Sequence, residues 1–259
     1  MVEVELYQSA LLVAGIFNIA MAFTLCHNNF LYHNFKVYQR ACFFTAMCFL
    51  VFGIGFFLHY TFVLRTVWPA GATALSVSYF HIGGMMVSWS HTSLLNPSYL
   101  TRRVVVRDIA IAVIGLITYW TTAYYCSLPI FHLSLLIFLL HVTWLAFKFY
   151  HTYYTVSHSM TENNLYEQTD GKKKFTLFTY HRSFLLSCHL IIGFGIGSII
   201  LTAFNPTAMW PYTLLLSIGI VVFIYIFYSL CEYGIVIDSA TNALDEMTLF
   251  GRKKAKAKI

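Results

Sequence analysis

Long apolar runs, each about the length of a membrane-spanning helix, recur along this chain and limit what it can fold into. A helix needs about 20 mostly apolar residues to cross roughly 30 Å of hydrocarbon. Seven segments meet this requirement, at about 6–26, 41–64, 70–95, 109–126, 130–150, 184–204 and 211–236. Only 10% of the residues are charged, whereas soluble domains carry about a quarter. The sequence therefore predicts an all-α integral membrane protein, a bundle of seven transmembrane helices.

Basic residues collect on one side of the predicted membrane. The segments that share a side with the C-terminus hold all but one of the 16 basic residues: Lys36, Arg40, Arg102, Arg103, Arg107, Lys148, Lys172, Lys173, Lys174, Arg182, Arg252, Lys253, Lys254, Lys256 and Lys258. Only Arg65 falls on the other side. Because cytoplasmic loops carry an excess of Lys and Arg, we expect the N-terminus outside and the C-terminus in the cytoplasm. We expect this basic face to attract anionic lipids of the bilayer and not to bind nucleic acid directly.

The predicted spans divide the chain into a seven-helix membrane domain, 1–238, and a short basic cytoplasmic tail, 239–259. The polar segment 151–182 either extends the fifth and sixth helices beyond the membrane or forms a flexible loop, and both alternatives stay open. Glycines at 83–84 and in Gly193-x-Gly195-x-Gly197 are typical of places where helices approach closely.

Seven ionisable side chains lie inside the predicted spans, and such groups in a membrane often mark functional sites. They are His59, His81, His91, His132, His141, His189 and Glu232. No Asp, Lys or Arg lies near the middle of any predicted span. His81 and His141 fall near mid-depth, whereas His189 and Glu232 fall near the cytoplasmic side, so we expect the pairs His81–His141 and His189–Glu232. The remaining histidines fall near span ends, where their rings can reach water.

These residues predict two kinds of site. In the first, a small apolar or amphipathic ligand binds within the bundle, because Met and aromatic side chains adapt to irregular ligands. The candidate ligand-binding residues are His81, Met85, Trp89, His141, Trp144, His189 and Glu232, with Tyr79 and Met86 nearby. In the second, the intramembrane histidines carry protons or ligate haem b, with His81 and His141 as the iron ligands. Ordinary helix packing is a third explanation of the same residues.

Several chemistries are excluded by residues that the sequence lacks. Residues 211–236 contain no lysine for a retinal Schiff base, and the end of the third span reads SHTSLLNPSYL in place of the acidic-Arg-aromatic triplet of G-protein-coupled receptors. The six cysteines are scattered and form no metal-ligand spacing. No motif of an intramembrane protease occurs, so we expect no enzyme, no metal site and, apart from the haem alternative, no cofactor.

Two stretches carry a resemblance to a known group of proteins. They are LYHNFKVYQRACFFTAMCFLVFGIGFFLHY and SYFHIGGMMVSWSHTSLLNPSYLTRRVVVRDI, followed by an aromatic last span, FIYIFYSLCEYGIVID. This pattern resembles the seven-transmembrane sensor-like modules of Bacteroidetes membrane-bound transcriptional regulators and sensor kinases. The resemblance implies a multi-pass sensor of the bacterial cytoplasmic membrane.

Such modules precede a cytoplasmic output domain, but only SATNALDEMTLFGRKKAKAKI follows Asp238. We therefore expect signal transduction through a cytoplasmic or membrane partner, or through an output domain beyond residue 259. A structural subunit of a membrane complex is the remaining alternative.

Overall fold

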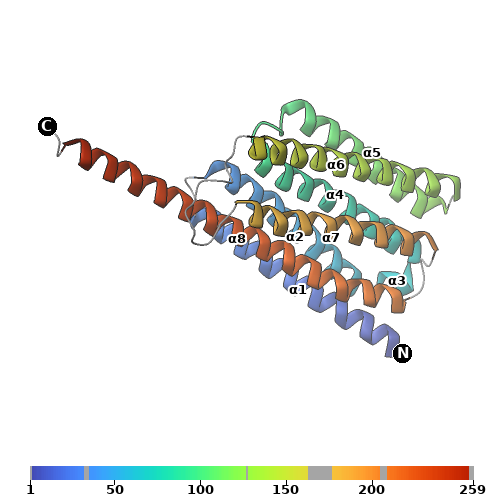
Figure 1. Ribbon diagram of the computed structural model, residues 1–259. Helices are drawn as coiled ribbons and strands as arrows, with labels where there is room; N and C mark the ends of the chain where they lie inside the picture. Colours follow the sequence, from blue (N-terminus) through green and yellow to red (C-terminus); the bar gives the residue numbers. More distant parts are fainter. Residues whose placement is uncertain (1, 32–34, 127, 163–176, 205–208, 257–259) are drawn as a thin grey trace.

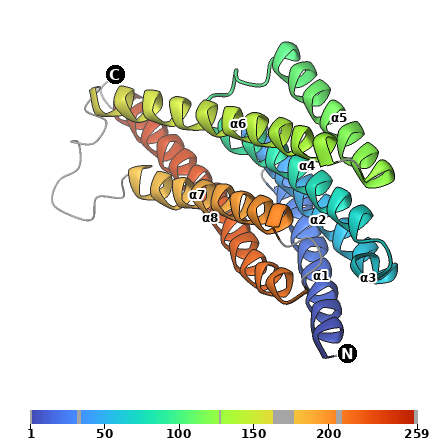
Figure 2. The same ribbon diagram turned by 90° about the vertical axis from the view of Figure 1, so that its right-hand side faces the viewer.

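The computed structural model describes residues 2–31, 35–126, 128–162, 177–204 and 209–256, and these residues form helices joined by short connections. The helices are α1 (Val2–Leu31), α2 (Lys36–Thr61), α3 (Leu64–Val67), α4 (Pro69–Leu95), α5 (Arg102–Tyr125), α6 (Leu128–Glu162), α7 (Leu177–Phe204) and α8 (Met209–Lys256). All except the short α3 lie side by side in one bundle (Figures 1 and 2). The described residues contain no strand.

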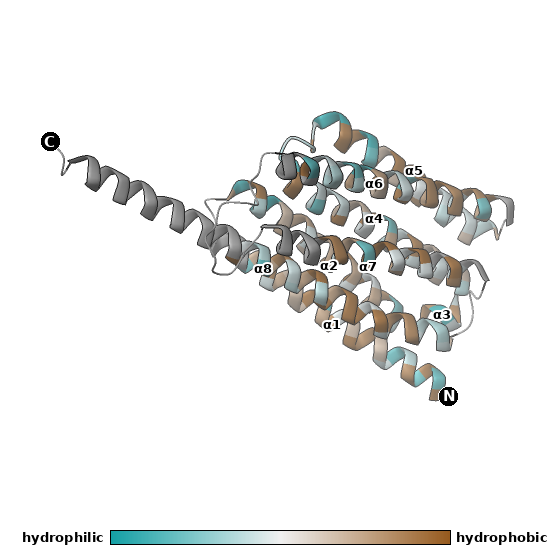
Figure 3. Ribbon diagram, viewed as in Figure 1, coloured by the Kyte–Doolittle hydropathy of each residue, from teal (hydrophilic) through white to brown (hydrophobic). Residues whose placement is uncertain are grey.

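Six of these helices are long and apolar enough to cross a membrane: α1, α2, α5, α6, α7 and α8. Large apolar side chains such as Val113, Ile117, Leu140 and Val221 point away from the bundle, and apolar residues recur along its outer helices (Figure 3). An exposed apolar surface of this extent suits a lipid environment better than water. The six helices therefore indicate an integral multi-pass membrane protein.

The predicted third span corresponds to α4, which is the central helix of the bundle. It packs against α2, α5, α6 and α7, and most of its residues are buried, including several serines and both of its histidines. Ser90 joins it to α2, through bonds to the Thr45 hydroxyl (2.8 Å) and the Ala41 carbonyl (2.9 Å). Because α4 faces protein on most sides, it can carry polar residues that a lipid-facing helix could not. α4, although 27 residues long, is not among the six helices whose apolar stretches are long enough to cross a membrane.

The observed helices are longer than the predicted spans. α6 continues to Glu162 and α7 begins at Leu177, so helical extension is observed at both ends of the polar segment, whose residues 163–176 lie outside the described part. α5 begins at Arg102, before the predicted start at 109, because Thr101 caps it by accepting a bond from the Val104 amide (3.4 Å). α8 continues through the predicted boundary at 238 without a break.

Each end of the bundle gathers a distinct set of residues. We call one the basic end, where α2 and α5 begin with Lys36, Arg102 and Arg103 and where α4 ends. The other is the N-terminal end, which holds Val2, α3 and the turn between α5 and α6 (Figure 1). α8 extends beyond the bundle on the side of the basic end (Figure 1).

Neighbouring glycines on α4 play different roles. A Cβ atom built on Gly83 would lie 2.3 Å from the Phe52 ring of α2, so this glycine permits close approach, as predicted. A Cβ atom on Gly84 would meet no described atom within 4 Å, and the same holds for Gly193, Gly195 and Gly197. Close approach at these four glycines is therefore not observed, because they face open space instead of a neighbouring helix.

Substitution of Gly83 and of Gly84 by alanine gives a matched pair of variants that tests this difference in packing. We expect Gly83→Ala to lower the free energy of unfolding by about 1–3 kcal/mol, because the packed Phe52 ring must shift. Gly84→Ala should be neutral or should stabilise the protein by up to about 1 kcal/mol through helix propensity. Unfolding of both variants in detergent micelles measures the difference, and equal stabilities would contradict this packing.

Candidate functional site

His81 of α4 and His141 of α6 meet in the middle of the bundle. His81 Nε2 lies 2.6 Å from His141 Nδ1, and both residues are buried. Each histidine sits near the middle of its helix, so their depths match and the two helices bring the rings together. The predicted pair His81–His141 is therefore present in the structure.

The pair is part of a longer polar chain. The Tyr119 hydroxyl of α5 lies 2.8 Å from His81 Nδ1, and His141 Nε2 lies 3.7 Å from Asp108 Oδ1. One arrangement of protons makes both hydrogen bonds of the chain: Tyr119 donates to His81 Nδ1, and His81 donates from Nε2 to His141 Nδ1. The His141 Nε2–H then faces the Asp108 carboxylate at 3.7 Å, which is beyond hydrogen-bond distance. All donors then point from Tyr119 towards Asp108. We call these four residues the polar chain.

Asp108 anchors the chain near the basic end. The Trp89 indole N–H donates to its Oδ2 (2.9 Å), and Arg107 Nε donates to its Oδ1 (2.8 Å). The Asp108 side chain is fully buried, whereas that of Arg107 is 37% exposed. The carboxylate therefore connects a buried histidine to a basic group that reaches the surface.

Asp108 was not among the predicted site residues, because it precedes the predicted span at 109–126, but it lies in the second turn of α5 and is buried. The search for apolar segments began the predicted span after Asp108, because basic residues precede this aspartate. The observed helix begins six residues before Asp108. The signal lies in the spacing of one buried face of α5, which consists of Asp108, Ala112, Gly115, Tyr119 and Ala123. Steps of three and four residues place all five on one side of a helix.

Gly115 makes room for the chain. A Cβ atom at this position would lie 2.9 Å from two His81 ring atoms and 3.0 Å from the Tyr119 hydroxyl. This role of Gly115 could not be predicted from the sequence, because it depends on His81 of α4 lying opposite the glycine.

The other predicted ligand residues on α4 and α6 divide between the core and the surface. Met85 and Trp89 are buried with Ala112 and Leu145. Trp144 is 41% exposed, and its ring lies beneath the Lys148 ammonium group, 4.6 Å from the ring centroid, with the Arg107 guanidinium at 5.5 Å. Trp144 therefore lies on the surface of the bundle beside the two cations.

Tyr99 lies in the connection between α4 and α5, close to the same cluster. Burial raises the pKa of its phenol, and the nearby Asp108 carboxylate raises it further. The phenol is therefore held in its neutral form.

The predicted pair His189–Glu232 is wrong. His189 is exposed, its Nδ1 bonds to the Leu185 carbonyl (2.8 Å), and its ring packs against Tyr150 of α6. No ion pair joins these two described residues, and Glu232 on α8 is half-buried. The pair was predicted from the similar depths of the two residues in the membrane, but depth does not specify how each helix is rotated about its axis. In the structure, α7 is rotated so that His189 faces α6.

Two histidines that we expected to reach water are buried. His59 Nε2 bonds to the Ser76 hydroxyl (3.1 Å), and His91 Nε2 bonds to the Ser187 hydroxyl (3.2 Å). Both rings are 1% exposed. The third of these histidines, His132, is exposed as expected. The difference arises because α2 and α4 are inner helices whose ends are covered by neighbours.

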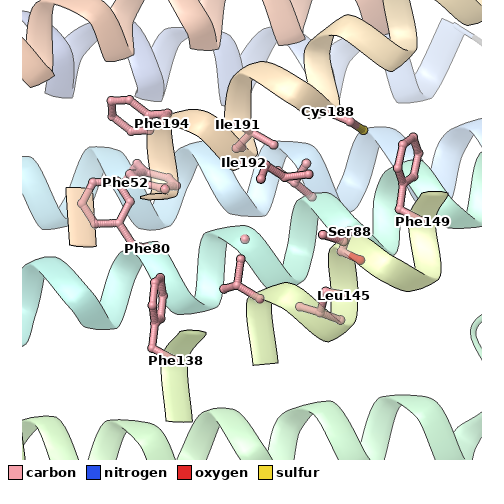
Figure 4. Close-up of a pocket in the computed structure, with 15 residues that line it drawn as sticks. Phe52, Phe80, Ser88, Phe138, Leu145, Phe149, Cys188, Ile191, Ile192 and Phe194 are labelled. Atoms are coloured by element: carbon pink, nitrogen blue, oxygen red, sulfur yellow. The ribbon is translucent and has the colours of Figure 1, made fainter. Parts of the chain in front are cut away.

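An apolar cavity lies between α2, α4, α6 and α7, beside the polar chain (Figure 4). The space within it is about 60 Å³, and the void reaches about 630 Å³ only when the part open to the surroundings is included. Rings from all four helices line it, among them Phe52, Phe80, Phe138 and Phe194, and Figure 4 shows the side chains converging on one space. Among the described residues that line it, only Ser88 carries a hydroxyl. We call this space the main cavity.

The two histidines do not fit haem ligation in this arrangement. Haem ligation by this pair would require the macrocycle to lie between the two histidine nitrogens. Here the facing nitrogens bond to each other at 2.6 Å, and the Tyr119 and Phe138 rings pack against His81. The geometry instead fits the transfer or storage of a proton.

Comparisons with protein-family models, with curated proteins and with solved structures found no match to this chain. The polar chain and the main cavity are therefore the two features on which a proposed function can be built.

Removal of the Asp108 side chain tests the polar chain. Asp108→Ala leaves the buried Trp89 N–H without its acceptor, so we expect a loss of about 1–3 kcal/mol in unfolding free energy. Asp108→Asn keeps an acceptor oxygen and should lose less. Unfolding in detergent, with intrinsic tryptophan fluorescence as the readout, measures both variants. Identical losses for the two would contradict the role given to the carboxylate oxygens.

Proposed function

We propose that the protein is a seven-transmembrane sensor, receptor-like and without enzymatic activity, which binds a small apolar or amphipathic ligand in the main cavity. The observation that carries this proposal is the apolar space itself, which is bounded by four helices. It is bordered by Gly84 and Gly195, at which an added Cβ atom would meet no described atom within 4 Å. Ligand sites are typically concave, mostly apolar and furnished with few polar groups. The main cavity has this character.

The proposal takes α4 as the seventh span. Its 27 residues extend about 40 Å at 1.5 Å per residue, which exceeds the hydrocarbon thickness. With seven spans the basic end faces the cytoplasm of a bacterial cell, where it can lie on anionic lipids, and the N-terminal end faces outward.

Two exposed cysteines at opposite ends test this orientation. Cys26 lies near the basic end of α1, and Cys126 lies in the turn after α5. We expect a membrane-impermeant maleimide to label Cys126 in intact cells and Cys26 only after permeabilisation. Labelling in the reverse order would contradict the proposed orientation.

Signal transmission is proposed to run through α6. Its residues Phe138, Val142 and Leu145 line the main cavity, and His141 lies among them on the same helix. Beyond the cavity α6 continues to Glu162. A ligand that binds better when α6 and α7 stand in one of two positions shifts the population of that position. A cytoplasmic or membrane partner then reads the change at the basic end.

Filling the main cavity tests ligand binding. We choose tritiated dodecanol as a neutral, apolar probe for the purified protein. Gly84→Leu should reduce dodecanol binding at least about tenfold, because the added side chain occupies the space, and the matched variant Gly84→Ala should change it little. Binding to the wild type should also alter amide exchange in residues 148–156 of α6. Unchanged binding in folded Gly84→Leu would remove the proposed site.

A second candidate function, proton-coupled transport, is supported by the direction of the polar chain. Its donors all point one way, from Tyr119 to Asp108, and these residues are eleven positions apart on α5, or about 17 Å along the axis. Buried chains of His and carboxylate groups are typical of proton relays in membrane proteins. The exposed Arg107 would place the end of this relay at the basic end.

Proton flux distinguishes this candidate from sensing alone. In liposomes with an imposed pH gradient and a pH-sensitive dye inside, a transporter should dissipate the gradient faster than protein-free liposomes. His81→Phe, which keeps an aromatic ring but removes both nitrogens, should abolish this difference, and Trp144→Phe on the surface should preserve it. Equal rates with and without wild-type protein would exclude proton flux under these conditions.

A further inference from the structure

Basic residues of the bundle differ in whether the protein itself satisfies their charge. Arg65, in α3 at the N-terminal end, is only 3% exposed, and its guanidinium donates to the hydroxyls of Tyr7 (3.2 Å) and Ser76 (3.3 Å). Arg107 on α5 forms an ion pair with Asp108 at 2.7 Å. Both guanidinium groups therefore have partners within the protein.

Lys148 on α6 differs from these two arginines. It is half-buried, and its ammonium lies over the rings of Trp144 and Phe147, 4.6 Å and 6.0 Å from their centroids. No carboxylate in the described part of the chain forms an ion pair with it. A charge on a membrane helix is costly and usually pairs with another group. We therefore expect Lys148 to take an anionic partner from outside the protein.

An open groove lies between α5 and α6, beside this charge. Its lining residues come from both helices: Arg107, Ile111, Ile137, Leu140, His141 and Trp144. The space within it is about 330 Å³. Since a water-sized group takes about 30 Å³, the groove can hold a segment of an alkyl chain. Leu140 is 61% exposed, so the groove opens to the outside of the bundle, where a membrane protein meets lipid. We call it the α5–α6 groove.

The α5–α6 groove extends from the middle of the bundle towards the basic end. His141 marks the middle, where it meets His81. Lys148 lies seven residues further along α6, or about 10 Å nearer the basic end. Half of the hydrocarbon thickness is about 15 Å, and the flexible stem of a lysine can carry its ammonium the rest of the way to a headgroup. The groove therefore has a cationic end at headgroup level and an apolar end deeper in the membrane.

We propose that the α5–α6 groove binds one anionic phospholipid of the leaflet at the basic end. Its phosphate lies against the Lys148 ammonium and beside the Trp144 ring. One of its acyl chains lies in the groove along Leu140 and the two isoleucines. This site is separate from the main cavity, so the inference goes beyond the proposed function and does not depend on a ligand in that cavity.

Charge complementarity selects an anionic lipid for this groove. A zwitterionic headgroup such as phosphatidylcholine carries its own cation, which would lie close to Lys148 and to the nearby Arg107. Phosphatidylglycerol ends in neutral hydroxyl groups and keeps a net negative charge. Because Asp108 already pairs with Arg107, Lys148 supplies the charge that distinguishes the two lipids. One basic residue near a membrane surface favours an anionic lipid by about fivefold.

Native mass spectrometry of the whole chain tests the choice of headgroup. The protein is held in detergent micelles with equal amounts of phosphatidylglycerol and phosphatidylcholine that carry identical acyl chains. The first lipid bound to the wild type should be phosphatidylglycerol, with a preference of at least about fivefold. Lys148→Gln should reduce this preference at least about threefold, and Lys148→Arg, which keeps the charge, should retain it.

Arg103→Gln is the matched control, because Arg103 is an exposed basic residue at the same end of the bundle and outside the groove. This variant should keep the preference within about twofold of the wild type. Equal reductions in folded Lys148→Gln and Arg103→Gln would show a general attraction to the basic end and would overturn the site.

Brominated acyl chains locate the lipid without a change at Lys148. Bromine quenches a nearby tryptophan, and the difference between the wild type and Trp144→Phe gives the signal of Trp144 alone. In phosphatidylcholine liposomes, a small fraction of brominated phosphatidylglycerol should quench this signal at least about twofold more than the same fraction of brominated phosphatidylcholine. Equal quenching of Trp144 by the two lipids would overturn the proposed position.

A free anion is distinguished from a lipid by competition. Excess inorganic phosphate should leave the first phosphatidylglycerol bound, because the acyl chain contributes to its affinity. Release of the lipid by phosphate would assign the groove to a free phosphate group and would overturn the lipid. Dodecanol binding, which tests the main cavity, is measured separately, so failure of either proposal leaves the other standing.

Discussion

A polar helix inside a membrane protein must find its hydrogen-bond partners within the protein, because hydrocarbon offers none. This constraint governs α4, whose serines, threonines and histidines would be costly against lipid. The bond between His81 and His141 is the central instance, since it joins α4 to α6 at mid-depth. Bonds of Ser90 to α2 and of His91 to Ser187 on α7 connect the same helix to its other neighbours.

The two candidate features follow from this placement of α4. The polar chain forms because α5 presents Asp108 and Tyr119 on the face that meets α4, with Gly115 between them to admit the His81 ring. The main cavity forms where α4 turns Gly84 towards α6 and α7 and where no side chain fills the space. Polar and apolar sites thus lie on adjacent faces of one helix. His141 and the cavity-lining Val142 are consecutive residues of α6, so movement of that helix would affect both sites.

Apolar length predicted each large helix from the sequence, because a run of 20 apolar residues has few alternatives in a membrane. The pair His81–His141 was also predictable, since both residues sit at mid-depth. Depth alone failed for His189, because it leaves the rotation of a helix undetermined. Asp108 was missed for a related reason. A predicted span ends where the apolar run meets a charged residue, whereas the observed helix α5 and its buried face continue past Asp108.

Other features could not be read from the sequence. Arg65 follows a predicted span and precedes the next, which is the usual setting of a surface charge, and only the left-handed backbone at Val63 (φ 47°) and the short α3 turn it inward. The cavities form where side chains from different helices do not contact one another, and the spacing of residues along one helix does not predict such gaps in packing. Gly83 and Gly84 are an example, because they are identical neighbours in the sequence with different surroundings. Gly83 faces the packed Phe52 ring, whereas Gly84 faces an empty space.

The contact between His81 and His141 holds the polar helix α4 against α6. A double-mutant cycle tests this contact, with unfolding free energies measured in detergent for His81→Ala, His141→Ala and the double variant. Direct hydrogen bonds between membrane helices contribute about 0.6 kcal/mol on average and up to about 1.7 kcal/mol. The structure predicts a favourable coupling energy at the upper part of this range, because both rings are buried and the nitrogens are 2.6 Å apart. Strictly additive losses would contradict the contact and, with it, the position of α4.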